Sequence, residues 1–313
     1  MLLAVTMNPS VDISYRLNQL VVDDVNRTNE VSKTAGGKGL NVARVAKQTE
    51  LEVAATGIIG GYLGGYITQQ LEAVDIHHEF FRIDQESRNC IAVIHEGNQT
   101  EILESGPTIS NEEENKFLDH FEKMVRSGQY TLITMSGSLP SGMTPSVYKK
   151  MIRLANEVNI PVILDASGNN LIEIIEDKSL SLMAIKPNLD ELSTIEEKDF
   201  DEDITAIKET LKGARYETAE WIVLSLGGAG SIVKHGNDFY RLSVPKIEVA
   251  SPVGSGDSTV AGLAYDYLSE QSHEDMMKSA MTTGVLNTMN EQTGSIDFSC
   301  FEDVFNQIKI EKI

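Results

Sequence analysis

Short, almost uninterrupted apolar runs alternate along the chain with longer amphipathic stretches. The apolar runs are too short for helices and are bounded by turn residues, which predicts buried strands. These strands are expected at Leu2–Met7, Val53–Ile59, Tyr130–Met135, Pro161–Leu164, Met183–Ile185 and Trp221–Leu226. Helices are expected at Leu40–Gln48, Glu112–Arg126, Pro145–Glu157 and Thr205–Lys212, with two or more further helices from Asp257 onward. This order predicts a three-layer α/β/α domain, in which helices cover both faces of a mostly parallel central sheet.

Three segments show a different pattern, in which polar and apolar residues alternate. They are Val11–Leu17, Val25–Thr34 and Cys90–Leu103. Such alternation is typical of a sheet with one face exposed to water. We therefore expect one domain over residues 1–313, with a small β-sheet lid formed by approximately residues 11–34 and 88–104.

Composition and charge narrow the possible partners. The 313 residues carry a formal net charge of −21 and are 41% hydrophobic, which is a globular composition. A net acidic protein is a poor partner for nucleic acid or for an anionic membrane, so we expect neither. Residues 1–60, however, hold six basic and six acidic side chains. A small anion could therefore still bind through a few placed cations.

The small number of cysteines and the absence of a long apolar stretch indicate where in the cell the protein is expected. Cys90 and Cys300 form neither a disulfide framework nor a metal-binding spacing. No stretch approaches 18 consecutive apolar residues, and the first residues lack the basic segment of a signal peptide. We expect a cytoplasmic protein.

Two glycine-rich segments each precede a predicted helix. Gly36, Gly37 and Gly39 surround Lys38 and are followed by Asn41. Glycines allow the backbone to come close to a ligand, and the free N–H groups at a helix start attract anions. By itself, this segment could equally be a turn without a ligand.

The second segment is Ser251–Ser258, in which Gly254, Ser255 and Gly256 could direct several N–H groups at one anion. Asp257 follows them in the first turn of the helix. Aspartate there often caps the helix. It could also take a proton from a substrate hydroxyl, and the two roles are compatible.

Two further segments follow predicted strands. Asn188 and Glu191 lie three residues apart after one strand, so they could share a helix face and supply oxygen ligands to Mg²⁺. Capping of the helix by Asn188 is the simpler explanation. The segment Ser225–Ser231 could contact a nucleotide, or it could be a tight hairpin turn.

The order of these motifs resembles that of the ribokinase superfamily, in the branch of the phosphofructokinase-B type sugar kinases. The resemblance rests on Gly36–Asn41, on Pro252–Thr259 and on the pair Asn188 and Glu191, and it extends over the whole chain. It implies a ribokinase-like fold, ATP and Mg²⁺ as cofactors, a sugar phosphate as substrate, and a homodimer formed through the lid. Strings such as Arg88–Ala92 and Asn8–Tyr15 resemble the tagatose-6-phosphate kinases within this branch. The 1-phosphofructokinases share many of these features.

The resemblance also implies a role for individual residues. Asp257 would be the catalytic base, and Gly254, Ser255 and Gly256 would bind the transferring phosphoryl group. The sugar phosphate would be bound by Asp12, Arg27, Gly37, Lys38, Asn41, Arg88, Ser136 and Ser138. The nucleotide would be bound by Lys186, Asn188, Ser225, Gly227, Gly228, Gly230 and Asn287, and Mg²⁺ would be organised by Asn188 and Glu191.

Three functions remain open at this point. The first is a kinase that converts tagatose 6-phosphate to tagatose 1,6-bisphosphate. The second is a 1-phosphofructokinase, which converts fructose 1-phosphate to fructose 1,6-bisphosphate. The third is a non-catalytic sensor of sugar phosphates, against which the intact Asp257 and its glycine loop count.

Overall fold

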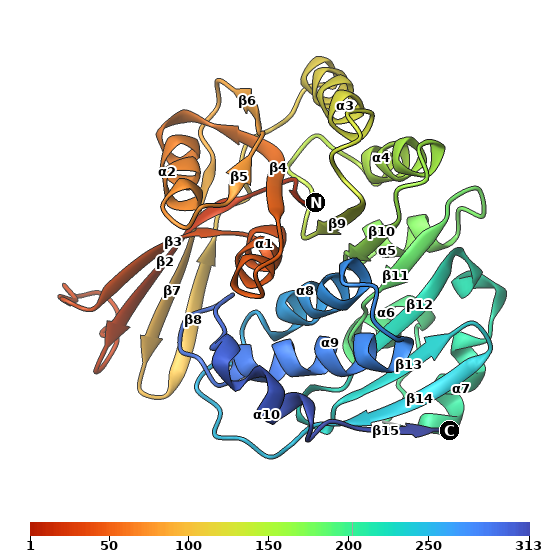
Figure 1. The fold of residues 1–313 in the computed structure, drawn as a ribbon. Helices are drawn as coiled ribbons and strands as arrows, with labels where there is room; N and C mark the ends of the chain where they lie inside the picture. Colours follow the sequence, from red (N-terminus) through yellow and green to blue (C-terminus); the bar gives the residue numbers. More distant parts are fainter. Residues whose placement is uncertain (202) are drawn as a thin grey trace.

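A computed structural model describes residues 1–201 and 203–313. One large sheet runs through the molecule, and a second, smaller sheet projects from one side of it (Figure 1). The strands of the large sheet are β1 (Leu2–Thr6), β4 (Val53–Gly60), β5 (His77–His78), β6 (Phe81–Ile83), β9 (Leu132–Ser136), β10 (Val162–Asp165), β11 (Leu182–Ile185), β12 (Ala219–Ser225), β13 (Ser231–His235), β14 (Asp238–Ser243) and β15 (Lys309–Lys312).

The large sheet is mostly parallel. Its strands lie in the order β15-β14-β13-β12-β11-β10-β9-β1-β4-β5, and β6 also pairs with β4. The pairs between β12 and β15 are antiparallel, whereas those from β12 through β4 to β5 and β6 are parallel. All six strands predicted from the apolar runs are present, which confirms the expected fold class.

Helices cover both faces of this sheet and separate two hydrophobic cores. One core includes residues of α1 (Lys38–Gln48), α2 (Gly61–Glu72), α8 (Ser255–Leu268), α9 (His273–Thr288) and α10 (Phe301–Phe305). The other includes residues of α3 (Asn111–Val125), α4 (Ser146–Glu157), α5 (Asn169–Ile175), α6 (Leu189–Glu196) and α7 (Ile204–Leu211). Short 3₁₀ turns occupy Ala214–Thr218, Gly227–Ala229 and Phe298–Cys300. The predicted three layers are therefore confirmed.

The smaller sheet is the expected lid. Its four strands are β2 (Ser10–Leu17), β3 (Val31–Gly36), β7 (Arg88–His95) and β8 (Asn98–Leu103), in the order β3-β2-β7-β8. Strands β2 and β7 are parallel, and the outer pairs are antiparallel. The lid projects from the main body (Figure 1), and every residue of β8 is exposed.

The sequence-based assignment differs from the structure in several places, and the strands β5, β6 and β14 are among the elements that it did not predict. Residues 25–30, expected in a lid strand, form a mostly exposed loop, because the regular ladder with β2 begins only at Val31. The helices α2 and α5 were not predicted, since their sequences are rich in glycine or asparagine. The C-terminal strand β15 was also missed, because its alternating charged residues resemble a surface loop until β14 offers an edge.

No helix among the described residues is long and apolar enough to cross a membrane.

Candidate functional site

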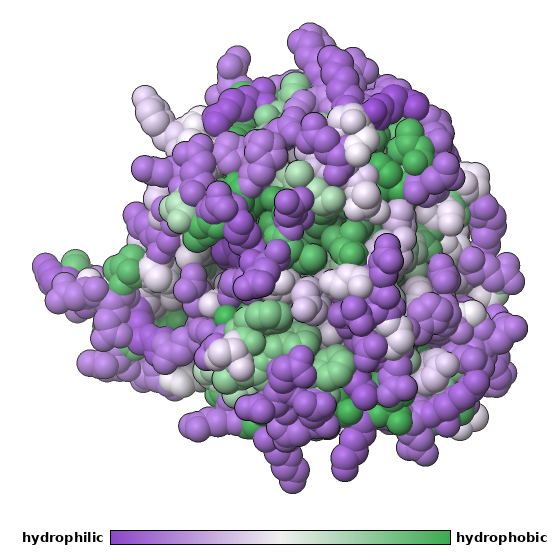
Figure 2. Space-filling model, in the orientation of Figure 1, coloured by the Kyte–Doolittle hydropathy of each residue, from purple (hydrophilic) through white to green (hydrophobic). Residues whose placement is uncertain are grey.

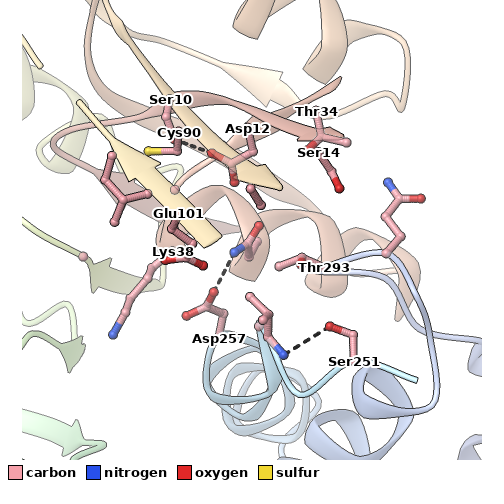
Figure 3. Close-up of a pocket in the computed structure, with 18 of the residues that line it drawn as sticks. Ser10, Asp12, Ser14, Thr34, Lys38, Cys90, Glu101, Ser251, Asp257 and Thr293 are labelled. Atoms are coloured by element: carbon pink, nitrogen blue, oxygen red, sulfur yellow. Dashed lines mark hydrogen bonds between the residues drawn. The ribbon is translucent and has the colours of Figure 1, made fainter. Parts of the chain in front are cut away.

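A large cleft lies between the lid and the carboxyl ends of the parallel strands. It has a volume of about 1220 Å³ and is lined by residues from both sheets and from the starts of α1 and α8. Ligands of open α/β sheets bind at this edge, because the loops that follow the parallel strands converge there. Figure 3 shows Asp12 and Cys90 on the lid side and Asp257 on the opposite side.

Asp257 lies in the first turn of α8, where only 5% of its surface is exposed. The helix cap is the backbone of Gly254, in a left-handed conformation with φ 84°, so Asp257 does not cap the helix. Its Oδ2 instead accepts a hydrogen bond of 2.6 Å from Nδ2 of Asn41 (Figure 3). The carboxylate therefore has one oxygen held by the protein and one left for a ligand.

The surroundings of Asp257 favour proton uptake near neutral pH. Burial raises the pKa of its carboxyl from 3.8 to about 7, and the negative charge of Asp165 adds to this effect. The hydrogen bond from Asn41 and the charges of Lys38 and Lys186 oppose the increase. A carboxylate with such a pKa is suited to general base catalysis at neutral pH.

Asp165 is a buried carboxylate at the end of β10, and its side chain is fully buried. The ammonium groups of Lys38 and Lys186 each lie 3.5 Å from its Oδ1. Neither carboxylate oxygen of Asp165 has a hydrogen-bond partner within the described residues. The Asp165 charge raises the pKa of Lys38, so this lysine stays protonated beside the cleft. Asp165 thus holds two cations at the sheet edge.

The lid supplies Asp12 to the cleft. Its carboxylate accepts a hydrogen bond of 2.6 Å from Ser10 Oγ, and its pKa is raised by burial. Gly36 is required beside it, because a Cβ there would lie 2.0 Å from the Asp12 carboxylate. Cys90 pairs with Asp12 across strands β2 and β7, and burial raises the pKa of its thiol. Asp12 is thereby fixed with its carboxylate facing a ligand.

The predicted phosphate-binding cations are only partly brought together. Arg88 lines the cleft, with Nε donating to Asn8 O at 3.1 Å and Nη1 donating to Glu104 O at 3.0 Å. Lys38 lines it as well. Arg27 lies in the exposed loop that precedes β3 and does not line this cleft.

The loop after β9 contributes one of the two predicted serines. Ser138 lines the cleft, whereas Ser136 is fully buried and its Oγ has no hydrogen-bond partner within the described residues. Ser136 is the last residue of β9 and pairs with Asp165 in β10. The expected role of Ser136 in sugar contact is therefore corrected, because the strand carries its side chain into the interior.

The starts of α1 and α8 supply backbone donors. Gly37 is the N-cap of α1 and has φ 106°, and both Gly37 and Asn41 line the cleft. In the α8 loop, the N–H of Ser255 donates to Pro252 O at 3.3 Å. The N–H groups of Gly256 and Asp257 have no acceptor among the described residues. The anion-binding end of α8 therefore consists of N–H groups next to the carboxylate of Asp257.

Asn188 and Glu191 form a capping box at the start of α6. The N–H of Glu191 donates to Asn188 Oδ1 at 2.7 Å, and the N–H of Asn188 donates to Glu191 Oε2 at 2.9 Å. The simpler explanation for this motif is thus correct. Both residues also line the cleft, so capping leaves room for a second role.

Some of the predicted nucleotide-binding residues line the cleft, and others do not. Lys186 and Ser225 line the cleft. Gly227, Gly228 and Gly230 do not; they form the tight turn between β12 and β13, in which a Cβ on Gly230 would lie 2.0 Å from Leu242 O. Asn287 is fully buried and its amide bonds to Val253 O and to the N–H of Gly294, so its expected position beside adenine is corrected.

Sequence reasoning missed four residues that the structure brings to the site. Asp165, Glu101 and Thr293 line the cleft, and Arg44 lies behind it. Asp165 could have been found, because it directly follows a predicted apolar strand on the ligand-binding edge. Glu101 lies in a strand with polar residues on both sides, where the sequence does not show which face turns inward.

Within the described residues, no group of three or more His, Cys, Asp or Glu side chains is placed to hold a metal ion. A metal ion bound here would therefore need other ligands in addition to the protein.

Known proteins share both the sequence pattern and the fold. The family model described as "pfkB family carbohydrate kinase" matches residues 5–298. A Staphylococcus aureus protein described as a "putative phosphofructokinase" is 27% identical, with a TM-score of 0.84, and the match covers 100% of this chain and 99% of that one.

Two further structures share the fold at lower identity. A protein of Thermotoga maritima described as a possible 1-phosphofructokinase is 23% identical, with a TM-score of 0.87 and coverage of 100% and 99%. Phosphofructokinase-2 of Escherichia coli in complex with fructose-6-phosphate is 22% identical, with a TM-score of 0.85 and coverage of 97% and 98%.

The family match spans nearly the whole chain and includes every loop that lines the cleft. The chain belongs to the pfkB family of carbohydrate kinases.

Proposed function

We propose that this protein transfers the γ-phosphoryl group of ATP to a hydroxyl of a ketohexose phosphate, and that its substrate is tagatose 6-phosphate, which becomes tagatose 1,6-bisphosphate. The observation that carries the proposal is the buried carboxylate of Asp257, which lies beside free N–H groups at the start of α8 and faces the cleft.

Asp257 would act as the base. Asn41 holds its Oδ2, so the other carboxylate oxygen is available to accept the proton of the sugar hydroxyl. The sugar oxygen then forms a bond to the γ-phosphorus as the bond from that phosphorus to the leaving ADP oxygen breaks. The N–H groups of Gly256 and Asp257 lie where they could stabilise the charge on the transferring group.

The positions of two cations, Lys186 and Arg88, suggest that each binds the phosphate of a different substrate. Lys186 is only 5% exposed and lies at the end of β11, on the side of Ser225, which suits the phosphates of ATP. Arg88 comes from the lid and lies near Asp12, which suits the phosphate already on the sugar. Lys38 lies between them and could contact either group.

The donor set fits a Mg²⁺ ion that arrives with ATP. Magnesium in such sites is held by one or two protein oxygens, by waters and by the phosphates. Glu191 uses one carboxylate oxygen in the helix cap, which leaves the other for a cation or its water. Bound to ATP, Mg²⁺ would neutralise charge on the phosphates, and Glu191 and Asn188 would orient it.

Two observations support a ketohexose phosphate. The cleft contains Lys38 and Arg88, which an uncharged sugar would leave without an anion. Phosphofructokinase-2 of Escherichia coli, which shares the fold, has been seen with fructose-6-phosphate. The strings around Arg88 and Asn8 favour tagatose 6-phosphate within this class.

A second candidate is fructose 1-phosphate, and the similarity to the Thermotoga protein described as a possible 1-phosphofructokinase favours it. The test is a measurement of kcat/KM with ATP for tagatose 6-phosphate, fructose 1-phosphate and other hexose phosphates. We expect the highest value for tagatose 6-phosphate. A large preference for fructose 1-phosphate would assign the second function, and no turnover with any sugar phosphate would instead indicate a sensor.

We also propose a homodimer formed through the lid. Several apolar side chains are exposed on it or at its tip: Val21, Val22, Val25, Val31, Ile102 and Leu103. Figure 2 shows a few hydrophobic side chains on the projecting arm, on a face that also has larger hydrophobic areas near its centre. Such a surface on a protein in water is typical of an interface. Light scattering should give twice the chain mass of 34.4 kDa, and a monomer at micromolar concentration would contradict the proposal.

A further inference from the structure

Arg44 is a half-buried arginine of α1 that is not among the residues lining the cleft. Its guanidinium donates to Ala35 O, to Asn41 Oδ1 and, at 3.2 Å, to Thr293 O. Burial lowers its pKa, while the charges of Asp12 and Asp257 oppose this effect. It forms no ion pair within 4.0 Å among the described residues, and its Nε has no hydrogen-bond partner among them. The guanidinium is therefore held by neutral oxygens, one of which belongs to the side chain that bonds to Asp257.

The contact with Asn41 determines how that amide is turned. Asn41 lies between two groups of opposite character, because the guanidinium can only donate and an ionised carboxylate can only accept. Only one orientation of the amide satisfies both neighbours, with Oδ1 toward Arg44 and Nδ2 toward Asp257. The reversed orientation would place an amide oxygen against the carboxylate and N–H groups against the guanidinium.

We propose that Arg44 is a positioning residue that locks the Asn41 amide, and thereby holds Asp257 ionised with one defined oxygen free for the sugar hydroxyl. The inference rests on the proposed role of Asp257 as the base. Arg44 does not touch a substrate in this arrangement; it acts through Asn41.

The segment Thr293–Gly294 also contacts Arg44 and Asn41. Thr293 accepts from Arg44 through its carbonyl oxygen and lines the cleft. A Cβ on Gly294 would lie 3.0 Å from Arg44 Nη2 and 3.1 Å from Asn41 Cβ, so only glycine allows this close cover. Gln48 holds the same segment without touching the Arg44 guanidinium: it donates to Gly294 O and to the backbone oxygen of Arg44, and it accepts from the N–H of Ile296. The chain therefore offers a matched control for loosening this segment without disturbing Asn41.

Loss of Arg44 should change the proton affinity of Asp257. The charged groups that face Asp257 are Asp165 on β10, Lys186 after β11, and Lys38 and Arg44 on α1. Without Arg44 one positive charge is lost, and the amide of Asn41 is free to turn its oxygen toward a protonated Asp257. Both changes favour the neutral acid, so the acid limb of the pH–rate profile should move to higher pH.

The experiment compares kcat, KM and the pH profile of kcat for R44M, R44K and Q48A with those of the intact enzyme, using the preferred sugar phosphate. For R44M we expect kcat to fall by about tenfold, with the acid limb moved upward by about half a pH unit or more and KM for ATP unchanged within about twofold. R44K retains the charge and one donor, so its acid limb should lie close to that of the intact enzyme. Q48A should keep the kcat and the acid limb of the intact enzyme while losing thermal stability.

A double-mutant cycle decides whether Arg44 acts through Asn41. If it does, N41A combined with R44M should have the same kcat as N41A alone within about twofold, because the partner is already lost. Additive losses, or an acid limb that R44M leaves in place, would overturn the proposal. If R44M does not fold, R44Q, which also lacks the positive charge, takes its place in the cycle. Failure of the base role itself would show separately, as normal turnover by D257N.

Discussion

The floor of the cleft and its lid side are built differently. The floor consists of Asp165, Asp257 and Lys186, which lie at the sheet edge or in the first turn of a helix and are nearly inaccessible to water. The lid side carries Arg88 and Glu101 on strands whose residues are half-buried or exposed. Burial alters the pKa of Asp257, whereas the lid offers charges close to solvent. In the proposed function, the floor would therefore perform the chemistry and the lid would recognise the sugar phosphate.

The largest expected effect comes from changing the floor at Asp257. D257N preserves the size of the side chain and its bond to Asn41 but cannot take a proton. We expect kcat to fall by about 10²-fold or more, with KM for both substrates changed by less than about threefold. Steady-state kinetics with the preferred sugar phosphate checks this. Turnover near the original rate would contradict the proposal that the floor performs the chemistry.

The same variant should be more stable than the natural sequence at neutral and alkaline pH. Because the pKa of Asp257 rises from 3.8 to about 7 on folding, the folded state binds more protons between these values. The free energy of unfolding of the natural sequence therefore decreases as pH rises through this range. D257N lacks this loss, so its advantage should grow from pH 4 to pH 7 and then stay constant, at no more than about 4 kcal/mol. Urea denaturation at pH 5 and pH 8 measures it; equal differences at both pH values would contradict the assigned pKa.

A change in the lid should instead affect binding of one substrate. R88A removes a charge-assisted contact, which is worth about 1.5–3 kcal/mol, so KM for the sugar phosphate should rise by about 10- to 100-fold. KM for ATP should stay within about twofold. R82A is the matched control, because Arg82 is exposed on β6 and does not line the cleft. Equal losses for the sugar phosphate and ATP in R88A would refute the proposal that the lid recognises only the sugar phosphate.

The smallest effect is expected at the helix cap near the proposed Mg²⁺ position. In E191Q the glutamine can still accept from the N–H of Asn188, as glutamine does in capping boxes, so thermal stability should not change. Loss of the charge should raise the Mg²⁺ concentration needed for half-maximal rate by about three- to tenfold. A magnesium titration at fixed ATP checks this. If the melting temperature falls and the magnesium dependence does not, Glu191 is only a cap.

The floor was easier to predict from sequence than the lid. Gly37 and Gly254 stand where the backbone must come close to another group, and glycine-rich segments of this kind are recognisable in the amino-acid sequence itself. Apolar runs likewise predicted each central strand within two residues of its end, because a parallel strand that is buried on both faces has an unmistakable composition.

The residues that sequence reasoning missed or misplaced depend on contacts between distant segments. Arg44 has no local pattern that distinguishes it from a surface arginine, and its partner Thr293 lies about 250 residues away. Ser136 and Ser138 differ by two positions in one loop, yet the end of β9 buries the first and exposes the second. Asn287 lies in the helix that follows the Asp257 helix, but its amide bonds to the backbone of Val253 and Gly294 and it does not line the cleft. The direction of a side chain at a strand end or helix end is set by tertiary packing.

The role of Asp257 as the base is tested most directly by one comparison on D257N: calorimetric titration with the preferred sugar phosphate, and turnover measured on the same preparation. We predict an affinity within about threefold of that of the natural sequence, together with a loss of turnover of about 10²-fold or more. Normal turnover, or a loss of sugar-phosphate affinity large enough to explain the lower rate, would contradict this role.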